Sequence, residues 1–124
     1  MIEKEEIAQK IVNAAFRIHK ELGPGLLEKV YEVCFEYELK KAGLFVERQT
    51  KVPIHYDSIY FEEGLRLDIL VEKTVIVELK AMDQVNPVWQ AQLLSHLKLS
   101  GLSLGFLINF NVPLIKQGIK RMIL

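Results

Sequence analysis

Charged side chains lie in two neighbouring segments near the middle of the chain, where apolar residues would be expected. Asp68 lies in residues 65–71, and Glu78 and Lys80 lie in residues 75–81. Both segments alternate like strands, so positions 66, 68 and 70 share one face and positions 76, 78 and 80 share another. A hairpin that joins these faces brings two carboxylates and one ammonium together. Because side chains alternate with period two, this requires an odd-length connection around Lys73 or a compensating bulge.

The residue types in this cluster suit a divalent cation. Burying one uncompensated charge costs roughly several kcal/mol, so the cluster needs either internal pairing or a bound cation. Carboxylate oxygens are ligands for Mg²⁺ and Mn²⁺, and such an ion activates water for attack on a phosphodiester. Asp68 and Glu78 would bind the ion, and Lys80 would orient the water or offset charge developing on the phosphate. The alternative is a structural ion pair between Lys80 and one of the two carboxylates.

The composition limits the class of protein. The chain has 124 residues, half of them apolar, which suits a single domain over residues 1–124. Its sixteen basic and sixteen acidic residues cancel, so overall charge indicates neither a nucleic-acid nor a membrane partner. Cys34 is the one cysteine, and the first residues lack the order of a signal peptide, which favours a cytoplasmic location. No apolar run reaches the roughly eighteen residues that a membrane span requires.

Hydrophobic spacing and turn residues predict the order of the elements. Gly23-Pro24-Gly25 and Gly43 end two helices, and Asn86-Pro87 begins a third. Turns are expected at residues 57–58 and 62–64. The predicted elements are helices over 7–22 and 26–42, strands over 52–56, 59–61, 65–71 and 75–81, a helix over 87–101, a strand over 104–108 and a last helix over 112–121. This order predicts an α/β sandwich with a mixed sheet, formed by an antiparallel meander and a further apolar strand, with flanking helices.

The order and the charged residues resemble the PD-(D/E)XK nuclease superfamily. Its signature is an Asp on the second core strand, followed by Glu-x-Lys on the third, and this chain has Asp68 and Glu78-Leu79-Lys80. The resemblance implies a restriction-endonuclease-like fold and a Mg²⁺ or Mn²⁺ site, with the backbone carbonyl of Leu79 as an extra ligand.

Within the superfamily, residues 18–31 resemble the small bacterial and archaeal GxxExxY proteins, whose named positions are Gly25, Glu28 and Tyr31 here. By this resemblance Glu28 is a candidate third acidic ligand from the first helices, with a catalytic role. The alternative for Glu28 is a surface carboxylate that interacts with the helix dipole. For Tyr31 the alternatives are packing against the sheet and a hydrogen bond to a phosphate or to Glu28.

Three further polar residues are candidates for contacts with substrate or with the ligands. Arg66 would contact a phosphate or form a salt bridge. Gln92 would bond a site carboxylate or a DNA phosphate, or make a structural contact. Related exonucleases of recombination type often carry Gln-x-x-x-Tyr on this helix, and His96 stands here in place of the tyrosine. Zinc is not expected, because the three histidines are scattered and there is one cysteine.

The sequence therefore predicts a Mg²⁺- or Mn²⁺-dependent nuclease that acts on DNA rather than RNA, with water as the nucleophile. The alternative is an inactive module of nuclease fold that binds nucleic acid or protein, since a neutral chain has no evident basic groove. The basic residues that remain candidates for such a groove are Lys10, Arg17, Lys20, Lys29, Lys40, Lys41, Arg48 and Lys51. A homodimer is also predicted, because the helix over 88–99 and residues 122–124 are strongly apolar, although these residues would otherwise complete a monomer core.

Overall fold

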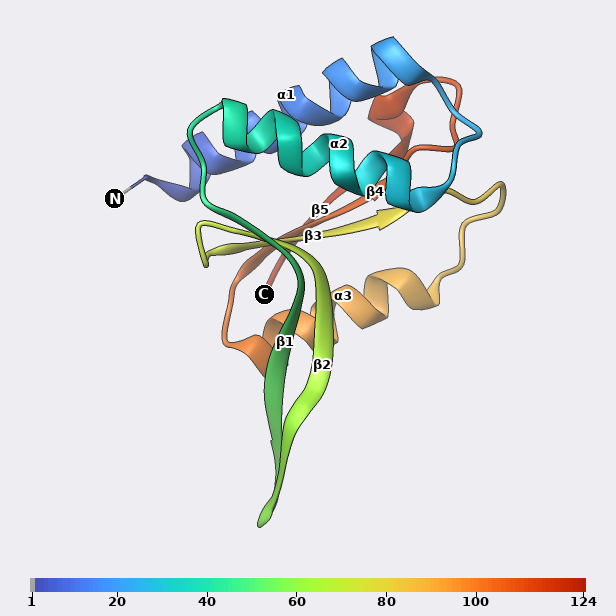
Figure 1. Ribbon diagram of the computed structural model, residues 1–124. Coiled ribbons are helices and arrows are strands. Elements are labelled where there is room, and N and C mark those ends of the chain that lie inside the picture. Colours follow the sequence, from blue (N-terminus) through green and yellow to red (C-terminus); the bar gives the residue numbers. More distant parts are fainter. Residues whose placement is uncertain (1) are drawn as a thin grey trace.

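The computed structural model describes residues 2–124 (Figure 1). Its elements in chain order are α1 (Lys4–Leu22), α2 (Glu28–Lys41), β1 (Val46–Tyr56), β2 (Ile59–Val71), β3 (Val75–Lys80), α3 (Val88–Ser100), β4 (Leu104–Asn109), the short 3-10 helix η1 (Ile115–Gly118) and β5 (Ile119–Ile123). None of the helices in this part of the chain is long and apolar enough to cross a lipid bilayer.

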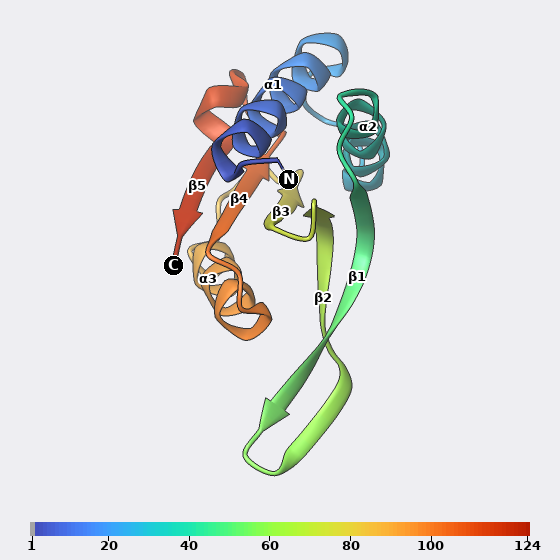
Figure 2. The same cartoon turned by 90° about the vertical axis from the view of Figure 1, so that its left-hand side faces the viewer.

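The strands form one sheet whose spatial order, β1-β2-β3-β4-β5, is also their order in the chain. β3 and β4 are parallel, and every other neighbouring pair is antiparallel. A parallel pair needs a crossover connection, and α3 supplies it. Helices α1 and α2 cover one face of the sheet and α3 lies against the other (Figures 1 and 2). The predicted α/β sandwich with a mixed sheet is thus confirmed.

Alternating side chains of β3 fill two hydrophobic cores on opposite faces of the sheet. Val75, Val77 and Leu79 belong to the larger core, beneath α1 and α2. Ile76 belongs to the smaller core, beside Trp89 and Leu93 of α3. All four β3 side chains are fully buried, and burying each one stabilises the fold by about 1.5 to 3 kcal/mol. The alternation predicted for this strand is therefore present, and it leaves Glu78 on the α3 face.

Strands β1 and β2 form a long hairpin that extends well beyond the helices (Figure 2). The turn predicted at residues 62–64 is wrong, because β2 runs through these positions. They form a bulge opposite Pro53, where the register shifts between Val52 and Ile54. Proline has no N–H to donate to the ladder, which favours a bulge here. Gly64 fits the close approach: a Cβ there would lie 2.7 Å from the Ile54 side chain.

The last helix predicted, over residues 112–121, is also wrong. The chain forms η1 and then β5, which pairs antiparallel with β4 from Ile119 to Ile123. Helical spacing of the apolar residues suggested the helix, but the free edge of β4 offers backbone hydrogen bonds that outweigh this local pattern. Gly118 permits the chain to pass close to the end of β4 as it enters β5, since a Cβ there would lie 2.1 Å from the Asn109 carbonyl oxygen.

Candidate metal centre

Asp68 and Glu78 occupy facing positions at the point where β2 and β3 separate, which we call the fork. The last residue pairs of this ladder are Val71 with Val75, Leu70 with Ile76 and Ile69 with Val77. Continuing this register places Asp68 opposite Glu78. The connection comprises residues 72–74 and has the odd length that the shared site requires; the Thr74 N–H closes it by donating to the Val71 carbonyl at 2.9 Å.

Beyond Ile69 and Val77, the two strands are joined by hydrogen bonds from backbone N–H groups to side-chain carboxylates. The Leu79 N–H donates to Asp68 Oδ2 at 3.0 Å. The Asp68 N–H donates to Glu78 Oε2 at 3.4 Å. A strand residue directs its N–H and C=O toward the same neighbour, so the Leu79 carbonyl also faces the fork between β2 and β3. The fork therefore gathers two carboxylates and one backbone carbonyl, all hard oxygen donors.

The pKa values of Asp68 and of the nearby Glu28 are both raised. Burial, and next the negative charge of Glu78, raise the pKa of Asp68 to about 7; the Leu79 N–H opposes this rise, and Glu28 adds to it. The pKa of Glu28 is raised too, mainly by burial of its carboxyl; the positive charge of Lys80 opposes the rise, and Glu32 and Glu78 add to it. Burial and the neighbouring carboxylates thus both disfavour the ionised form of Asp68 at this site.

Lys80 lies beside this cluster without forming the structural ion pair that was the alternative to a metal site. Within residues 2–124, no carboxylate oxygen comes within 4.0 Å of its ammonium. The Lys80 Nζ instead lies 5.5 Å from the centre of the Trp89 ring, which is a cation–π geometry. Lys80 is half-buried and remains available to a group that enters the fork.

Helix α3 contacts the site through His96. The Nδ1 atom of His96 is 2.7 Å from Glu78 Oε1, and because an ionised carboxylate only accepts hydrogen bonds, Nδ1 is the donor. Glu78 is 8% exposed, so this bond satisfies an oxygen that is largely removed from water. Gln92 is exposed on the same helix, and among the described residues its side chain has no hydrogen-bond partner.

Glu28 is the exposed first residue of α2, and Tyr31 holds the loop that precedes it. The fully buried Tyr31 stacks on Phe110, with ring centres 4.3 Å apart. Its hydroxyl donates to the Gly23 carbonyl at 2.7 Å and accepts from the Leu26 N–H at 3.1 Å. Of the two alternatives for Tyr31, the structure has the packed one. Its two bonds hold the loop that leads into Glu28.

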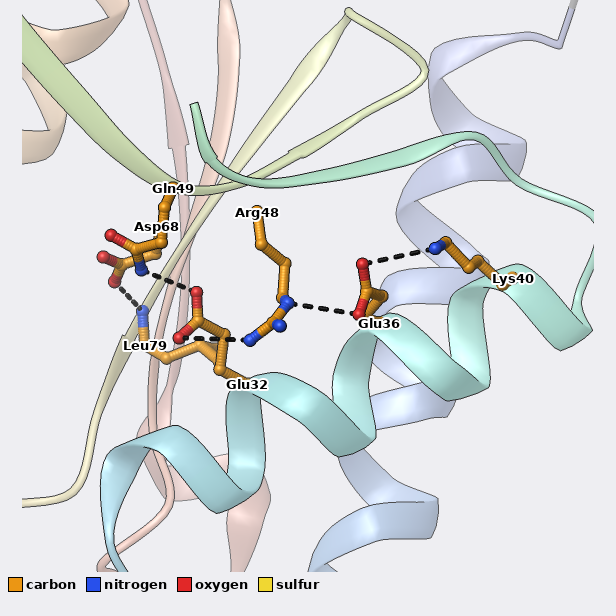
Figure 3. A network of polar contacts seen from close by, with 7 residues as sticks. All are labelled: Glu32, Glu36, Lys40, Arg48, Gln49, Asp68 and Leu79. Carbon is orange, nitrogen blue, oxygen red and sulfur yellow. Dashed lines mark hydrogen bonds and ion pairs between the residues drawn. The ribbon is translucent and has the colours of Figure 1, made fainter. Parts of the chain in front are cut away.

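A polar network next to the fork includes residues that the sequence did not indicate (Figure 3). Glu32 is only 9% exposed, and it accepts a hydrogen bond from Gln49 Nε2 at 2.7 Å. The Arg48 guanidinium lies 3.9 Å from Glu32 and 3.1 Å from Glu36. Helical spacing gave one signal for Glu32, because it follows Glu28 by four residues and shares its face.

Arg66 borders an open hollow on the α2 side of the fork. Residues lining the hollow are Glu28, Lys29, Glu32, Arg48, Gln49 and Arg66. Within residues 2–124, neither Arg66 nor Lys29 has a carboxylate oxygen within 4.0 Å, so the salt bridge considered for Arg66 is not formed. By contrast, six of the eight basic residues considered for a groove are paired, all except Lys20 and Lys29: Lys10 with Glu6, Arg17 and Lys41 with Glu38, Arg48 and Lys40 with Glu36, and Lys51 with Glu63.

The donor set fits a hard divalent cation that keeps part of its water shell. Mg²⁺ needs only one or two protein carboxylates and is otherwise bound by water and substrate oxygens. In the described residues, no three side chains of His, Cys, Asp or Glu are close enough together to hold an ion by themselves. Asp68 and Glu78, with the Leu79 carbonyl between the strands, provide the one or two carboxylates that Mg²⁺ needs.

Comparison with known families matches residues 5–122 to the PD-(D/E)XK nuclease superfamily. No curated protein and no solved structure matches the chain. The family match covers nearly the whole chain and includes both strands of the fork, so the chain belongs to the PD-(D/E)XK nuclease superfamily. Nucleases of this superfamily generally use divalent metals.

Proposed function

We propose that this protein is a Mg²⁺- or Mn²⁺-dependent phosphodiesterase that cleaves nucleic acid, with DNA as the substrate. One observation carries the proposal: Asp68 and Glu78 face each other in a fork of the sheet, beside Lys80, whose ammonium has no carboxylate oxygen within 4.0 Å among residues 2–124. The positions of Gly25, Glu28 and Tyr31 support placing the chain within the GxxExxY branch. A single domain over residues 1–124 and a cytoplasmic location stay predictions of the sequence.

Each residue of the fork has a distinct role in this proposal. Asp68, Glu78 and the Leu79 carbonyl would hold the ion. The resemblance also implies Glu28 as an acidic ligand, although in the described residues it does not form a group of three such side chains with Asp68 and Glu78. A divalent cation bound there supplies Lewis acidity toward a phosphoryl oxygen and an activated water. Lys80 places its ammonium where negative charge develops on the phosphate, and the Trp89 ring restrains it. His96 keeps the Glu78 carboxylate oriented.

Lys29 and Arg66 are the proposed contacts to the phosphates on either side of the cleaved bond. Both line the hollow that contains Glu28, and neither is neutralised by a neighbouring carboxylate in the described part of the chain. Affinity for nucleic acid comes largely from cations of this kind. Because the other basic residues of the α1–α2 region are mostly paired, binding should be weak and sensitive to salt.

Calorimetry with Mn²⁺ and a cleavage assay on single-stranded and duplex DNA test this function. Asp68→Asn and Glu78→Gln should each abolish cleavage and weaken Mn²⁺ binding, because each removes an anionic ligand. The matched control is Glu62→Gln, which removes a carboxylate from the exposed hairpin and should change neither. If the wild-type protein binds no Mn²⁺ at millimolar concentration, the metal-dependent function is wrong.

A second candidate is an inactive module of nuclease fold that binds nucleic acid or protein. The ion pairs that engage most basic residues of the α1–α2 region favour it, since they leave few cations for autonomous DNA binding. Under this candidate, Mn²⁺ would not bind and the fork would act only as a structural element. The calorimetry described above separates the two.

We also propose a homodimer, in which two sites would act on both strands of a duplex. Apolar residues support it: Ile123 and Leu124 at the end of β5 are 67% and 60% exposed, and Val88 on α3 is 47% exposed. Light scattering at micromolar concentration tests this assembly. A monomeric mass would exclude the paired cut and leave the single-site chemistry unchanged.

A further inference from the structure

The β1–β2 ladder is interrupted beside the proposed metal site. Arg48 pairs with Ile69 and Thr50 pairs with Leu67, but Gln49 and Asp68, which lie between these pairs, are not paired. The φ angle of Gln49 is 53°. This left-handed conformation is uncommon for a residue other than glycine and is not that of a strand. A specific contact is therefore needed to hold Gln49 in it.

The interruption changes which face of the sheet the β2 side chains occupy. Ile69 is buried under α1 and α2, whereas Leu67, two residues earlier, is buried against α3. In a regular strand these two residues would share a face. The strand therefore turns over at Asp68, which means that it rotates about its own axis so that alternate side chains exchange faces of the sheet. Freed from the β1 ladder, Asp68 directs its carboxylate to the Leu79 N–H of β3.

The side chain of Gln49 is hydrogen-bonded to Glu32, the buried carboxylate of the polar network. Its Nε2 donates to Glu32 Oε1 at 2.7 Å, and Figure 3 shows Gln49 and Asp68 side by side above Glu32. The Arg48 guanidinium, adjacent in sequence, lies near the other oxygen of Glu32 at 3.9 Å. A buried carboxylate that loses a hydrogen-bond donor is strongly destabilised, so Glu32 holds Gln49 in its left-handed conformation.

We propose that Gln49 and Glu32 form a positioning pair that keeps β2 turned over and so fixes the Asp68 carboxylate at the fork. Neither residue needs to contact the metal or the substrate. The effect on metal binding rests on the function proposed above, whereas the effect on the position of Asp68 does not. The residues act as outer partners that orient a ligand, and loss of such partners typically weakens metal affinity about 10- to 100-fold.

A charge swap tests the pair. Gln49→Glu sets two carboxylates against each other and should weaken Mn²⁺ binding about 10-fold or more. Combining it with Glu32→Gln restores one donor and one acceptor, and the double variant should recover most of the affinity. Lys40→Gln is the control, because it removes the Glu36 ion pair at the far end of the network and should leave Mn²⁺ affinity unchanged.

The metal-free readout is the amide resonance of Leu79, which reports the hydrogen bond to Asp68. This resonance should shift in Gln49→Glu and return in the double variant. If Gln49→Glu does not fold, Gln49→Gly replaces it, since glycine accepts the left-handed φ while losing the side-chain bond.

An unchanged Leu79 resonance in a folded Gln49 variant would overturn the inference, even if the variant melts at a lower temperature. If the wild type binds no Mn²⁺, the proposed function fails, and the Leu79 resonance still decides whether the pair positions Asp68.

Discussion

Asp68→Asn should stabilise the metal-free protein at high pH. The Asp68 carboxylate is held next to Glu78 in a largely buried fork, and its pKa is raised from 3.8 to about 7. Unfolded, the carboxyl ionises near its ordinary pKa; folded, it keeps its proton up to about pH 7. The contribution of Asp68 to the free energy of unfolding is therefore fully present below about pH 4 and is lost as the pH rises through 7. Asparagine has no such loss and still offers an oxygen to the Leu79 N–H.

The size of the effect follows from the shift. Each pKa unit corresponds to about 1.4 kcal/mol, so a rise of about three units gives an upper limit of about 4 kcal/mol above pH 8. Urea unfolding in EDTA, at pH 4 and at pH 8, measures it. The variant should exceed the wild type in stability at pH 8, with the two alike at pH 4 and the slopes of the transitions unchanged.

Excess Mn²⁺ should reverse the order at pH 8, because the ion stabilises only the protein that binds it. Two results would refute the reasoning. One is equal stability of both proteins at pH 8 without metal, which would mean that Asp68 is not strained by its neighbours. The other is equal stabilisation of both by Mn²⁺, which would place the ion elsewhere.

Other substitutions separate binding, chemistry and substrate contact. Lys80→Ala should keep Mn²⁺ affinity in calorimetry but lower kcat by about 100-fold or more, because its charge acts in the transition state; undiminished cleavage would contradict this role. Arg66→Gln should raise KM and reduce the slope of log affinity against log salt by about 0.7 to 0.9, whereas Lys41→Gln, which removes a paired lysine, should leave the slope unchanged. His96→Ala should cost about 1 to 3 kcal/mol in urea unfolding, because it leaves Glu78 buried without its donor; a smaller loss would show that water replaces the imidazole.

The sequence predicted the fork well because the signals for it are local. The odd length of the connection fixed the register that sets Asp68 opposite Glu78. The regular alternation predicted over residues 65–71 is wrong at Asp68, because Leu67 packs against α3 whereas Ile69 packs under α1 and α2. The glycines after α1 and α3 and Asn86 before α3 marked helix ends that the structure retains.

The errors arose where distant contacts outweigh local patterns. The spacing of Val112, Ile115, Ile119 and Met122 is helical, yet residues 119–123 form a strand that pairs with β4. The left-handed Gln49 has no sequence signal, since its conformation depends on Glu32 from another element. The burial of Glu32 likewise has no local signal, because nothing in α2 alone indicates that β1 covers it.

The order of the sheet has a consequence for folding during synthesis. Because each strand pairs with the strand next to it in the chain, the sheet is able to grow one strand at a time as the polypeptide leaves the ribosome, and such sequence-local pairing favours rapid folding. Helix α1 differs: its Ile7 and Ile11 share a core with Phe106, Phe110 and Ile115, near the other end of the chain. The apolar face of α1 is therefore fully covered only after β4 and η1 have been made, and a nascent chain that stalls before β4 exposes part of this face for chaperones to bind.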